Sequence, residues 1–556
     1  MATVASSSSS SSSSTTKTAK SENVGINKVV SFEELKKHDQ PNDLWIAING
    51  QVYDLTKFSQ LHPGGRAVLL AVAGKDASKQ FYALHNKAIL DKYKRLRVGS
   101  LENFAAEDAI PSAAEEDVVS EVPYAEAPLN REGWAVSPYM NDSHKEFYRA
   151  CREFVKHELL EDAVEGELAD EYPTKEVYEK MGAFGYLASR IGTAAMPLAK
   201  ELGIKLPANV SPDDFDVFHE MLAHEALGRL RQPGYGDGLG AGLCIGLPPV
   251  LIFSKPDLAQ TVASECLLGQ KRICLAISEP SAGSDVARIE LTGKKSACGG
   301  YYILNGVKKW ITNGMFSDYF VTAVRTGGPG MKGISMMLVP RNAKQLANNQ
   351  GNDVTTKQIQ TSYSKCAGTA LVMYDDVYVP VANLMGKENQ GFKCIMANFN
   401  HERWFISCQC LGIMRQLVQE TFQWAMQREV FGKILAEEPV IRQKLAKMIA
   451  AVEAVQSNLE QITYQMHKMD YFTQVAKLAG PISFLKYNTT RTMTMLADEA
   501  CQVFGGRAIT KTGLGDGCEK FNRTYKFASI LGGSEEIMAD LGVRMAMRDF
   551  PAKARL

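Results

Sequence analysis

The sequence predicts a multidomain α+β protein, in which a small mixed module precedes a larger unit of helices, strands and then helices again. Its length of 556 residues exceeds what one hydrophobic core usually supports. Strand-like and helix-like segments mix in residues 26–101, and helical periodicity fills residues 136–270. Period-two segments occupy residues 271–385, and long helical periodicity returns in residues 386–556.

The small module contains a clear strand pair. The stretch "LWIAINGQVYDLT" alternates apolar and polar residues on both sides of Asn49-Gly50. An Asn-Gly dipeptide flanked in this way indicates a β-hairpin. Short helical stretches lie on either side of "LHPGG", so we expect residues 26–101 to form one compact domain of strands and short helices.

Segments of biased composition flank this module. Residues 1–25 contain an unbroken serine run over residues 6–14, which is typical of a disordered tail. A mitochondrial transit peptide is the alternative, but the first 20 residues contain no Arg. Residues 102–135 are predicted to be an acidic linker exposed to solvent, because residues 98–130 hold eight acidic residues and no Lys or Arg.

The larger unit is predicted from its change of period. Helical patterns run through "HKEFYRACREFVKHELL" and "DDFDVFHEMLAHEALGRL". Alternating segments such as "YYILNGVKKWITNG" and "YFVTAVRT" then indicate strands, and Asn305-Gly306 predicts a second hairpin. After "NLMGKENQGF" the helical pattern continues to the end of the chain.

Composition excludes several classes of function. The 62 basic and 62 acidic residues cancel, so neither a nucleic acid nor an anionic membrane is expected as a partner. No apolar run approaches the ~20 residues of a membrane span. The 11 cysteines include no CxxC pair, a pattern that favours buried thiols in a reducing compartment over a disulfide framework.

Two histidines of the small module have distinctive surroundings. His62 lies in "LHPGG", where the glycines let the backbone approach a flat ligand, and His85 lies in "FYALHNKAIL". The whole run "VYDLTKF…HPGGRAVLLAVAGKDASKQF" resembles cytochrome b5. This resemblance implies that His62 and His85 are the axial ligands of a haem b that carries single electrons. A b5-like fold without haem is the alternative.

Four motifs of the larger unit occur in a fixed order. They are "CLAISEPSAGSDV" (residues 274–286), "KKWITNG", "REVFGK" (residues 428–433) and "CQVFGGRA" (residues 501–508). In this order within a helix–strand–helix body they resemble the acyl-CoA dehydrogenase family over roughly residues 136–556. The resemblance implies an N-terminal helical domain, a central β-barrel-like domain, a C-terminal four-helix bundle, an FAD cofactor and an acyl-CoA substrate.

The same resemblance implies the contacts of the flavin and the substrate. Trp310 would shield one face of the flavin, and Thr312 would hydrogen-bond near the nitrogen that accepts hydride. Positions implied to contact FAD within one subunit are Ala276, Ile277, Ser278, Trp310, Thr312 and Ser534. Positions implied to contact the substrate are Ser284, Asn400 and Arg403.

Other motif residues imply an oligomer. Arg428 and Phe431, like Gln502 and Gly506, match positions that reach the FAD of a neighbouring subunit in the family. A homodimer or homotetramer with shared FAD sites is therefore implied. One position departs from the family, since Pro439 stands where many members have a Gln eight residues after the Phe of this motif.

The catalytic base is the second departure. Many members carry it near the C-terminus in the pattern I-x-E-G-T/S, and this chain reads "ILGGS", which puts Gly532 in that position. Enzymes similar to isovaleryl-CoA dehydrogenase place the base within a pattern like L-E-R, and this chain reads "NFNHERWF". The resemblance thus implies Glu402 as base and the Gly532 backbone N–H as donor to the thioester carbonyl. An acid on a solvated helix face is the alternative for Glu402, while Glu535 and Glu536 are expected to start a helix without taking part in catalysis.

The predicted activity is FAD-dependent α,β-dehydrogenation of an acyl-CoA to a 2-enoyl-CoA, as in fatty acid β-oxidation, with electrons passed to the fused haem and on to an unknown acceptor. An oxygen-using flavin oxidase or monooxygenase is one alternative, and a non-catalytic redox or binding flavoprotein is another. The C-terminal Ala554-Arg555-Leu556 fits the small–basic–Leu pattern of peroxisomal addresses. The mitochondrial matrix and the cytosol are the alternative locations.

Overall fold

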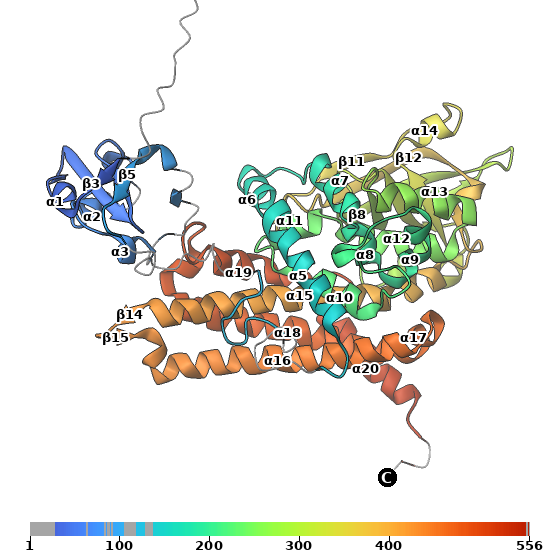
Figure 1. Cartoon of the computed structure of the whole chain (residues 1–556). Helices are drawn as coiled ribbons and strands as arrows, with labels where there is room; N and C mark the ends of the chain where they lie inside the picture. The colour runs from blue at the N-terminus through green and yellow to red at the C-terminus, as the bar shows by residue number, and fades with distance from the viewer. Residues whose placement is uncertain are drawn as a thin grey trace, which may run out of the picture. The chain divides into compact units, whose positions relative to one another are not determined.

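The computed structural model describes two compact units, residues 1–115 and 116–556, and Figure 1 draws both. The described residues are 28–62, 65–82, 85, 89–90, 93–104, 118–127, 137–551 and 554. The predicted serine-rich tail, most of the predicted linker, and Arg555 and Leu556 of the C-terminal tripeptide lie outside the described residues.

The first unit is built on a five-stranded sheet of order β1-β5-β4-β3-β2. Strands β3 and β4 pair antiparallel, and Asn49 and Gly50 between them both have positive φ, which confirms the predicted hairpin. Leu44, Ile46 and Ile48 alternate along β3 and pack with Leu69 of α2 in one apolar core. The elements are β1 (Val29–Val30), α1 (Phe32–Leu35), β2 (Asp39–Gln40), β3 (Asp43–Ile48), β4 (Gln51–Asp54), α2 (Arg66–Leu70), α3 (Ser78–Tyr82) and β5 (Arg97–Leu101).

The second unit opens with a helical part. All residues of its helix α10 are buried, so the other helices of this part pack around α10 on all sides. Helices α5 and α10 both start with a capping box that places a His at the third helical position. The helices are α5 (Asp142–Phe154), α6 (Leu160–Ala169), α7 (Lys175–Ala183), α8 (Tyr186–Ile191), α9 (Met196–Glu201), α10 (Val217–Gly228), α11 (Pro233–Gly238), α12 (Ala241–Phe253) and α13 (Pro256–Leu267).

Among the described residues, one helical stretch, Pro233–Phe253, is long and apolar enough to cross a membrane by length and composition alone. Of its most apolar window, 78% is buried inside the fold, as in the core helix of a globular domain. This stretch, which covers α11 and α12, is therefore weak evidence for a membrane span.

The central part is an eight-stranded sheet of order β11-β12-β8-β7-β9-β10-β13, with β6 paired to β9. The predicted hairpin at Asn305-Gly306 is wrong, because β8 runs straight through both residues. Asn305 instead exchanges two hydrogen bonds of 2.9 Å with Asp376 at a bulge in β12. The elements are β6 (Ile273–Ala276), β7 (Thr292–Lys295), β8 (Tyr301–Ile311), β9 (Tyr319–Arg325), β10 (Ile334–Pro340), α14 (Ala343–Leu346), β11 (Thr355–Gln358), β12 (Ala370–Pro380) and β13 (Leu384–Met385).

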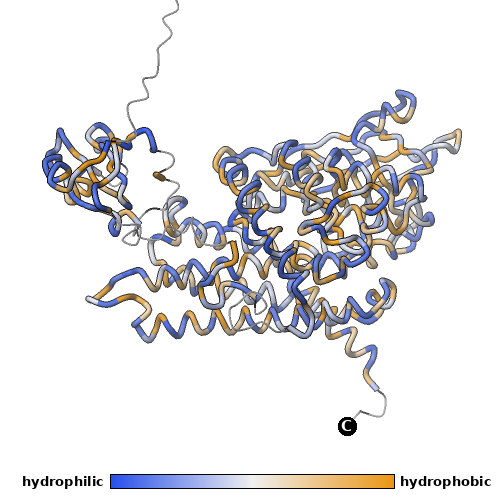
Figure 2. Tube along the Cα trace, viewed as in Figure 1, coloured by the Kyte–Doolittle hydropathy of each residue, from blue (hydrophilic) through white to orange (hydrophobic). Residues whose placement is uncertain are grey.

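Long helices complete the second unit, and α18 packs against α15, α16, α19 and α20. Buried apolar residues of α16 recur at alternating steps of four and three from Ile441 to Met466, which gives the helix one core face. Figure 2 shows the resulting alternation of hydrophobic and hydrophilic residues along these helices. The elements are α15 (Gly391–Gln427), β14 (Glu429–Val430), β15 (Lys433–Ile434), α16 (Pro439–Lys468), α17 (Tyr471–Lys477), α18 (Ala479–Phe504), α19 (Asp516–Ala528) and α20 (Glu535–Arg548).

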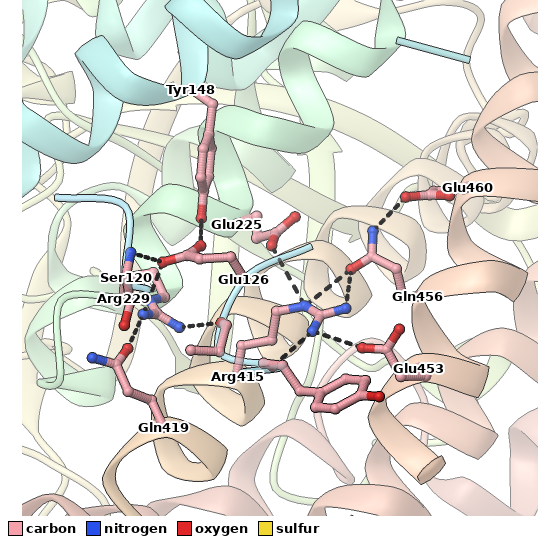
Figure 3. Close-up of polar contacts among 12 residues, drawn as sticks. Ser120, Glu126, Tyr148, Glu225, Arg229, Arg415, Gln419, Glu453, Gln456 and Glu460 are labelled. Atoms are coloured by element: carbon pink, nitrogen blue, oxygen red, sulfur yellow. Dashed lines mark hydrogen bonds and ion pairs between the residues drawn. The ribbon is translucent and has the colours of Figure 1, made fainter. Parts of the chain in front are cut away.

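Residues 118–127 do not behave as the solvated linker that their acidity predicts. Glu126 is fully buried and accepts a hydrogen bond from Arg152 at 2.8 Å. It accepts another from Arg229 at 3.2 Å, and Figure 3 labels Glu126 and Arg229. The Tyr148 hydroxyl and the Ser120 backbone N–H also donate to this carboxylate. The prediction failed for this segment because two buried arginines of the helical part need an anion, and Glu126 supplies it.

Replacing Glu126 with Gln should lower the free energy of unfolding of the second unit by about 3 kcal/mol or more, because it leaves two buried guanidinium groups without a counter-charge. Urea-induced unfolding measures this change. Glu121→Gln is the matched control, since Glu121 is exposed in the same acidic segment. Equal stability of the two variants would contradict the anchoring role of Glu126.

Candidate active site

A buried ion pair between Lys308 and Glu279 holds the end of strand β6. Nζ of Lys308 donates to the carbonyl of Ile277 at 2.9 Å and to Oε1 of Glu279 at 2.7 Å. The Glu279 carboxylate also accepts the backbone N–H groups of Glu290 and Leu291, which closes the loop after the strand. These bonds fix the backbone of the positions implied to contact the flavin ring, Ala276, Ile277 and Ser278.

Trp310 and Thr312 do not share one environment, although they are two residues apart, a spacing that places residues of a regular strand on one face. Trp310 has a left-handed φ of 67° and is 54% exposed, while Thr312 follows the end of β8 and is buried. The left-handed residue interrupts the period of two. A large exposed ring beside a buried hydroxyl is the arrangement that a flat ligand needs, with one surface to stack on and one donor to meet.

The "REVFGK" and "CQVFGGRA" motifs meet at the end of α15. Arg428 and Arg507 both lie over the ring of Trp424, at 6.0 Å and 4.6 Å from its centroid. Phe431, between β14 and β15, is 95% exposed with a φ of 50°. Gln502 is exposed, and a Cβ added to Gly506 would meet no atom within 4 Å, so this surface is open to a partner.

The turn before α20 is clamped by two cations. Gly532 and Gly533 have φ values of 67° and 108°, which glycine adopts readily. Nε of Arg403, from α15, donates to the Gly532 carbonyl at 3.0 Å. Nζ of Lys486, from α18, donates to the carbonyls of Gly533 at 2.8 Å and Ala528 at 3.0 Å. The backbone of this turn is therefore fixed from two helices.

Glu402 is the carboxylate that this turn faces. It is 5% exposed, and among the described residues its Oε2 has no hydrogen-bond partner. Burial raises its pKa to about 7, against the opposing charges of Arg403, Lys486 and His401. A Cβ added to Gly532 would lie 3.3 Å from Oε1 of Glu402, so Glu402 occupies the space that a side chain at position 532 would need.

The remaining predicted positions differ in how far they are buried. Asn400 is buried and its amide lies 3.4 Å from the Val475 carbonyl, whereas Ser284 is exposed in the loop after β6. Ser534 caps α20 by accepting the N–H of Ile537. Glu535 begins that helix but is buried, and it pairs with Arg491 at 3.5 Å.

A mostly apolar cavity lies close to Glu402. Phe405 and Ile406 of α15, one turn after Glu402, form part of its wall. Leu531 of the clamped turn and Thr312 of the β part also line it. The cavity thus borders the clamped turn, the helical turn that follows Glu402 and the residue implied to contact the flavin.

The two predicted haem ligands of the first unit face each other. The rings of His62 and His85 have centroids 6.0 Å apart, about the separation at which two imidazoles bind one metal ion from opposite sides. Nδ1 of His62 lies 3.4 Å from the Gly65 carbonyl, which orients the ring and leaves Nε2 free. Burial, aided by the nearby His62, lowers the pKa of His85 and favours the neutral form that ligates metals.

Comparisons with known proteins identify relatives of both units. Family models match residues 31–102 as a cytochrome b5-like heme/steroid binding domain, residues 274–375 as an acyl-CoA dehydrogenase middle domain, and residues 389–547 as an acyl-CoA dehydrogenase C-terminal domain. Acyl-CoA dehydrogenase apdG of Emericella nidulans is 38% identical over 439 residues, which cover 79% of this chain and 98% of the relative. The chain belongs to the acyl-CoA dehydrogenase family. The predictions of an oxidoreductase of this family and of a fused b5-like domain are confirmed.

Further relatives support the assignment. An acyl-CoA dehydrogenase of Alternaria alternata is 32% identical over 435 residues, covering 77% of this chain and 97% of the relative. The structure of butyryl-CoA dehydrogenase from Megasphaera elsdenii has a TM-score of 0.64 and 22% identity, covering 74% of this chain and all of that one. At that identity the likeness shows the shared fold, as predicted for the larger unit.

The sequence reasoning missed Lys486. The buried positions Ile482, Leu485 and Thr489 form one stripe on α18, and Lys486 falls within it. A lone Lys on an otherwise core-facing stripe was the available signal. Its partners lie in another part of the chain, so the sequence did not reveal what this ammonium group binds.

Gly532→Ala should lower the free energy of unfolding by about 1–2 kcal/mol, the cost of a side chain at left-handed φ. Crowding adds to this cost, because the new Cβ would lie 3.0 Å from Cδ1 of Ile406. Gly506→Ala is the matched control, since its methyl group would enter open space. Urea-induced unfolding of both variants tests the argument, and an unchanged stability of the Gly532 variant would refute it.

Proposed function

We propose that the protein catalyses FAD-dependent α,β-dehydrogenation of an acyl-CoA thioester to a 2-enoyl-CoA. The observation that carries this proposal is the buried Glu402 carboxylate, with one oxygen free of partners, beside a clamped glycine turn and an open cavity. The names of the fungal relatives apdG and its Alternaria counterpart support the substrate class.

The residues of the larger unit fit a flavin. Exposed Trp310, buried Thr312 and the fixed backbone of Ile277 provide a stacking surface and polar contacts for the ring. The open surface at Gly506 and the protruding Phe431 support FAD sites completed by a second subunit in a homodimer or homotetramer. When bound, FAD supplies the acceptor for the hydride that leaves the β-carbon of the substrate.

The chain itself handles the proton and the carbonyl. Glu402 removes the α-proton, and the electron pair of the broken C–H bond forms the new double bond as the β-hydrogen leaves. The Gly532 N–H donates to the thioester carbonyl, where negative charge develops. Arg403 and Lys486 hold the carbonyls of this turn, so the donor is in position before the reaction begins.

Glu402→Gln should reduce the rate of anaerobic flavin reduction by acyl-CoA at least ~100-fold while FAD stays bound, because the amide cannot accept the α-proton. Stopped-flow absorbance measures this rate. In the parent protein the rate should fall as the pH drops below about 7, since Glu402 must lose its proton to act. Glu535→Gln is the matched control, and similar rates for the two variants would contradict the assignment of the base.

The b5-like unit is proposed to bind haem b through His62 and His85 and to accept electrons from the dehydrogenase, for delivery to an acceptor outside the chain. The facing imidazoles support the binding step.

His85→Ala should abolish the haem absorbance of the purified protein, because one axial ligand is lost, while flavin reduction by acyl-CoA persists. His38→Gln is the control, since His38 stacks on Trp45 instead of facing another histidine. In the parent protein, anaerobic acyl-CoA should reduce flavin and haem in sequence. Flavin bleaching without haem reduction would refute the transfer, and peroxide release in air would favour the oxidase alternative.

A further inference from the structure

The cavity beside Glu402 is not uniformly apolar. Its walls are largely hydrophobic, yet three polar side chains converge at one place: Asp237 of α11, Tyr363 of the loop before β12, and Gln409 of α15. The Tyr363 hydroxyl donates to Oδ2 of Asp237, and the Gln409 amide donates to Oδ1 at 3.3 Å. A buried carboxylate in an acyl pocket requires an explanation, because alkyl chains cannot bond to it.

The position of this cluster relative to the base follows from helix geometry. Glu402 and Gln409 are seven residues apart on α15, hence on one face and about 10 Å apart along the axis. Leu531, which precedes Gly532 in the chain, lines the cavity on the side of the base. An acyl chain whose α-carbon lies at Glu402 therefore extends several carbon atoms before it meets Asp237.

Asp237 retains capacity to accept hydrogen bonds. A carboxylate offers about four acceptor sites, and the two donors above use two of them. The single Tyr363 proton also has a second acceptor, the Pro233 carbonyl at 3.1 Å. Among the described residues, no Lys, Arg or His forms an ion pair with Asp237, and burial raises its pKa to about 6 against the Tyr363 hydrogen bond and the nearby charge of Arg190. A ligand that brings a donor would satisfy this carboxylate better than the protein alone does.

Resting on the proposed dehydrogenation, we infer that the acyl group of the substrate carries a hydrogen-bond donor, a hydroxyl or an amine, which binds Asp237 at the far part of the cavity. The enzyme thus selects polar-substituted acyl thioesters over plain alkyl ones. Sites built to bond a polar group discriminate strongly against analogues that lack it, because the buried partner is then left unpaired.

The test compares acyl-CoA pairs of equal length that end in methyl, hydroxyl or amine, across a series of chain lengths. For wild type, the best hydroxyl- or amine-bearing substrate should exceed its methyl counterpart at least tenfold in the second-order rate constant of anaerobic flavin reduction. Non-reactive thioether analogues of the same pairs give dissociation constants, which should show the same order. Equal or better performance of the methyl compounds in wild type would overturn the inference.

Variants identify the residue and the donor. Asp237→Leu should invert the preference at least tenfold in favour of the methyl compounds, whereas exposed Asp214→Asn should leave it unchanged. Asp237→Asn removes the charge and turns one acceptor oxygen into an NH2 donor, so it should weaken an amine substrate more than a hydroxyl substrate, whose own oxygen can accept. An unchanged preference in Asp237→Leu would refute the role of Asp237 while leaving the dehydrogenation intact. Failure of every acyl-CoA to bleach the flavin would instead refute the proposed function itself.

Discussion

Glu402 and the Gly532 turn compete for one small volume, and the arrangement of the site depends on that competition. A Cβ at position 532 would lie 3.3 Å from Oε1 of Glu402 and 3.6 Å from Cε of Lys486. A side chain at position 532 would therefore crowd the carboxylate that enters from α15. The glycine that makes room also loosens the backbone, since it loses more conformational freedom on folding than any other residue. Arg403 and Lys486 compensate by binding the carbonyls of the turn.

Helix α15 concentrates buried charge along much of its length. Glu402 and Arg403 serve the candidate site, and Arg415 lies further along the helix with its guanidinium fully buried. Arg415 bonds to Gln456 and to the Tyr124 carbonyl, and it lies 4.0 Å from Glu225 (Figure 3). The segment before α5 thus contributes to the same charge network through its backbone and through Glu126. Removing one charged side chain from such a network lowers the free energy of unfolding, because a buried charge is left unpaired.

Short sequence patterns predicted those features that depend on neighbouring residues alone. Asn49-Gly50 makes a hairpin because both residues adopt positive φ, but Asn305-Gly306 has the same letters and lies inside a strand, where the side chain of Asn305 pairs with Asp376. The family motifs located Glu402 and Gly532, which the fold brings into contact. The partners of Lys486, Asp237 and Glu126 lie far away in the sequence, and only the packing of separate helices reveals them. Sequence periodicity marked these positions at most as core-facing or solvated.

Burial shifts the pKa values of Glu402 and Lys486 in opposite directions. Burial raises the pKa of Glu402 to about 7 and lowers the pKa of Lys486 to about 8. Below the first value the base is protonated and cannot accept the α-proton. Above the second, Lys486 loses the charge that lowers the pKa of Glu402, although its neutral amine still donates to the turn. The acidic limit of the site is therefore set by Glu402, and the burial that an acyl chain requires is what raises this limit.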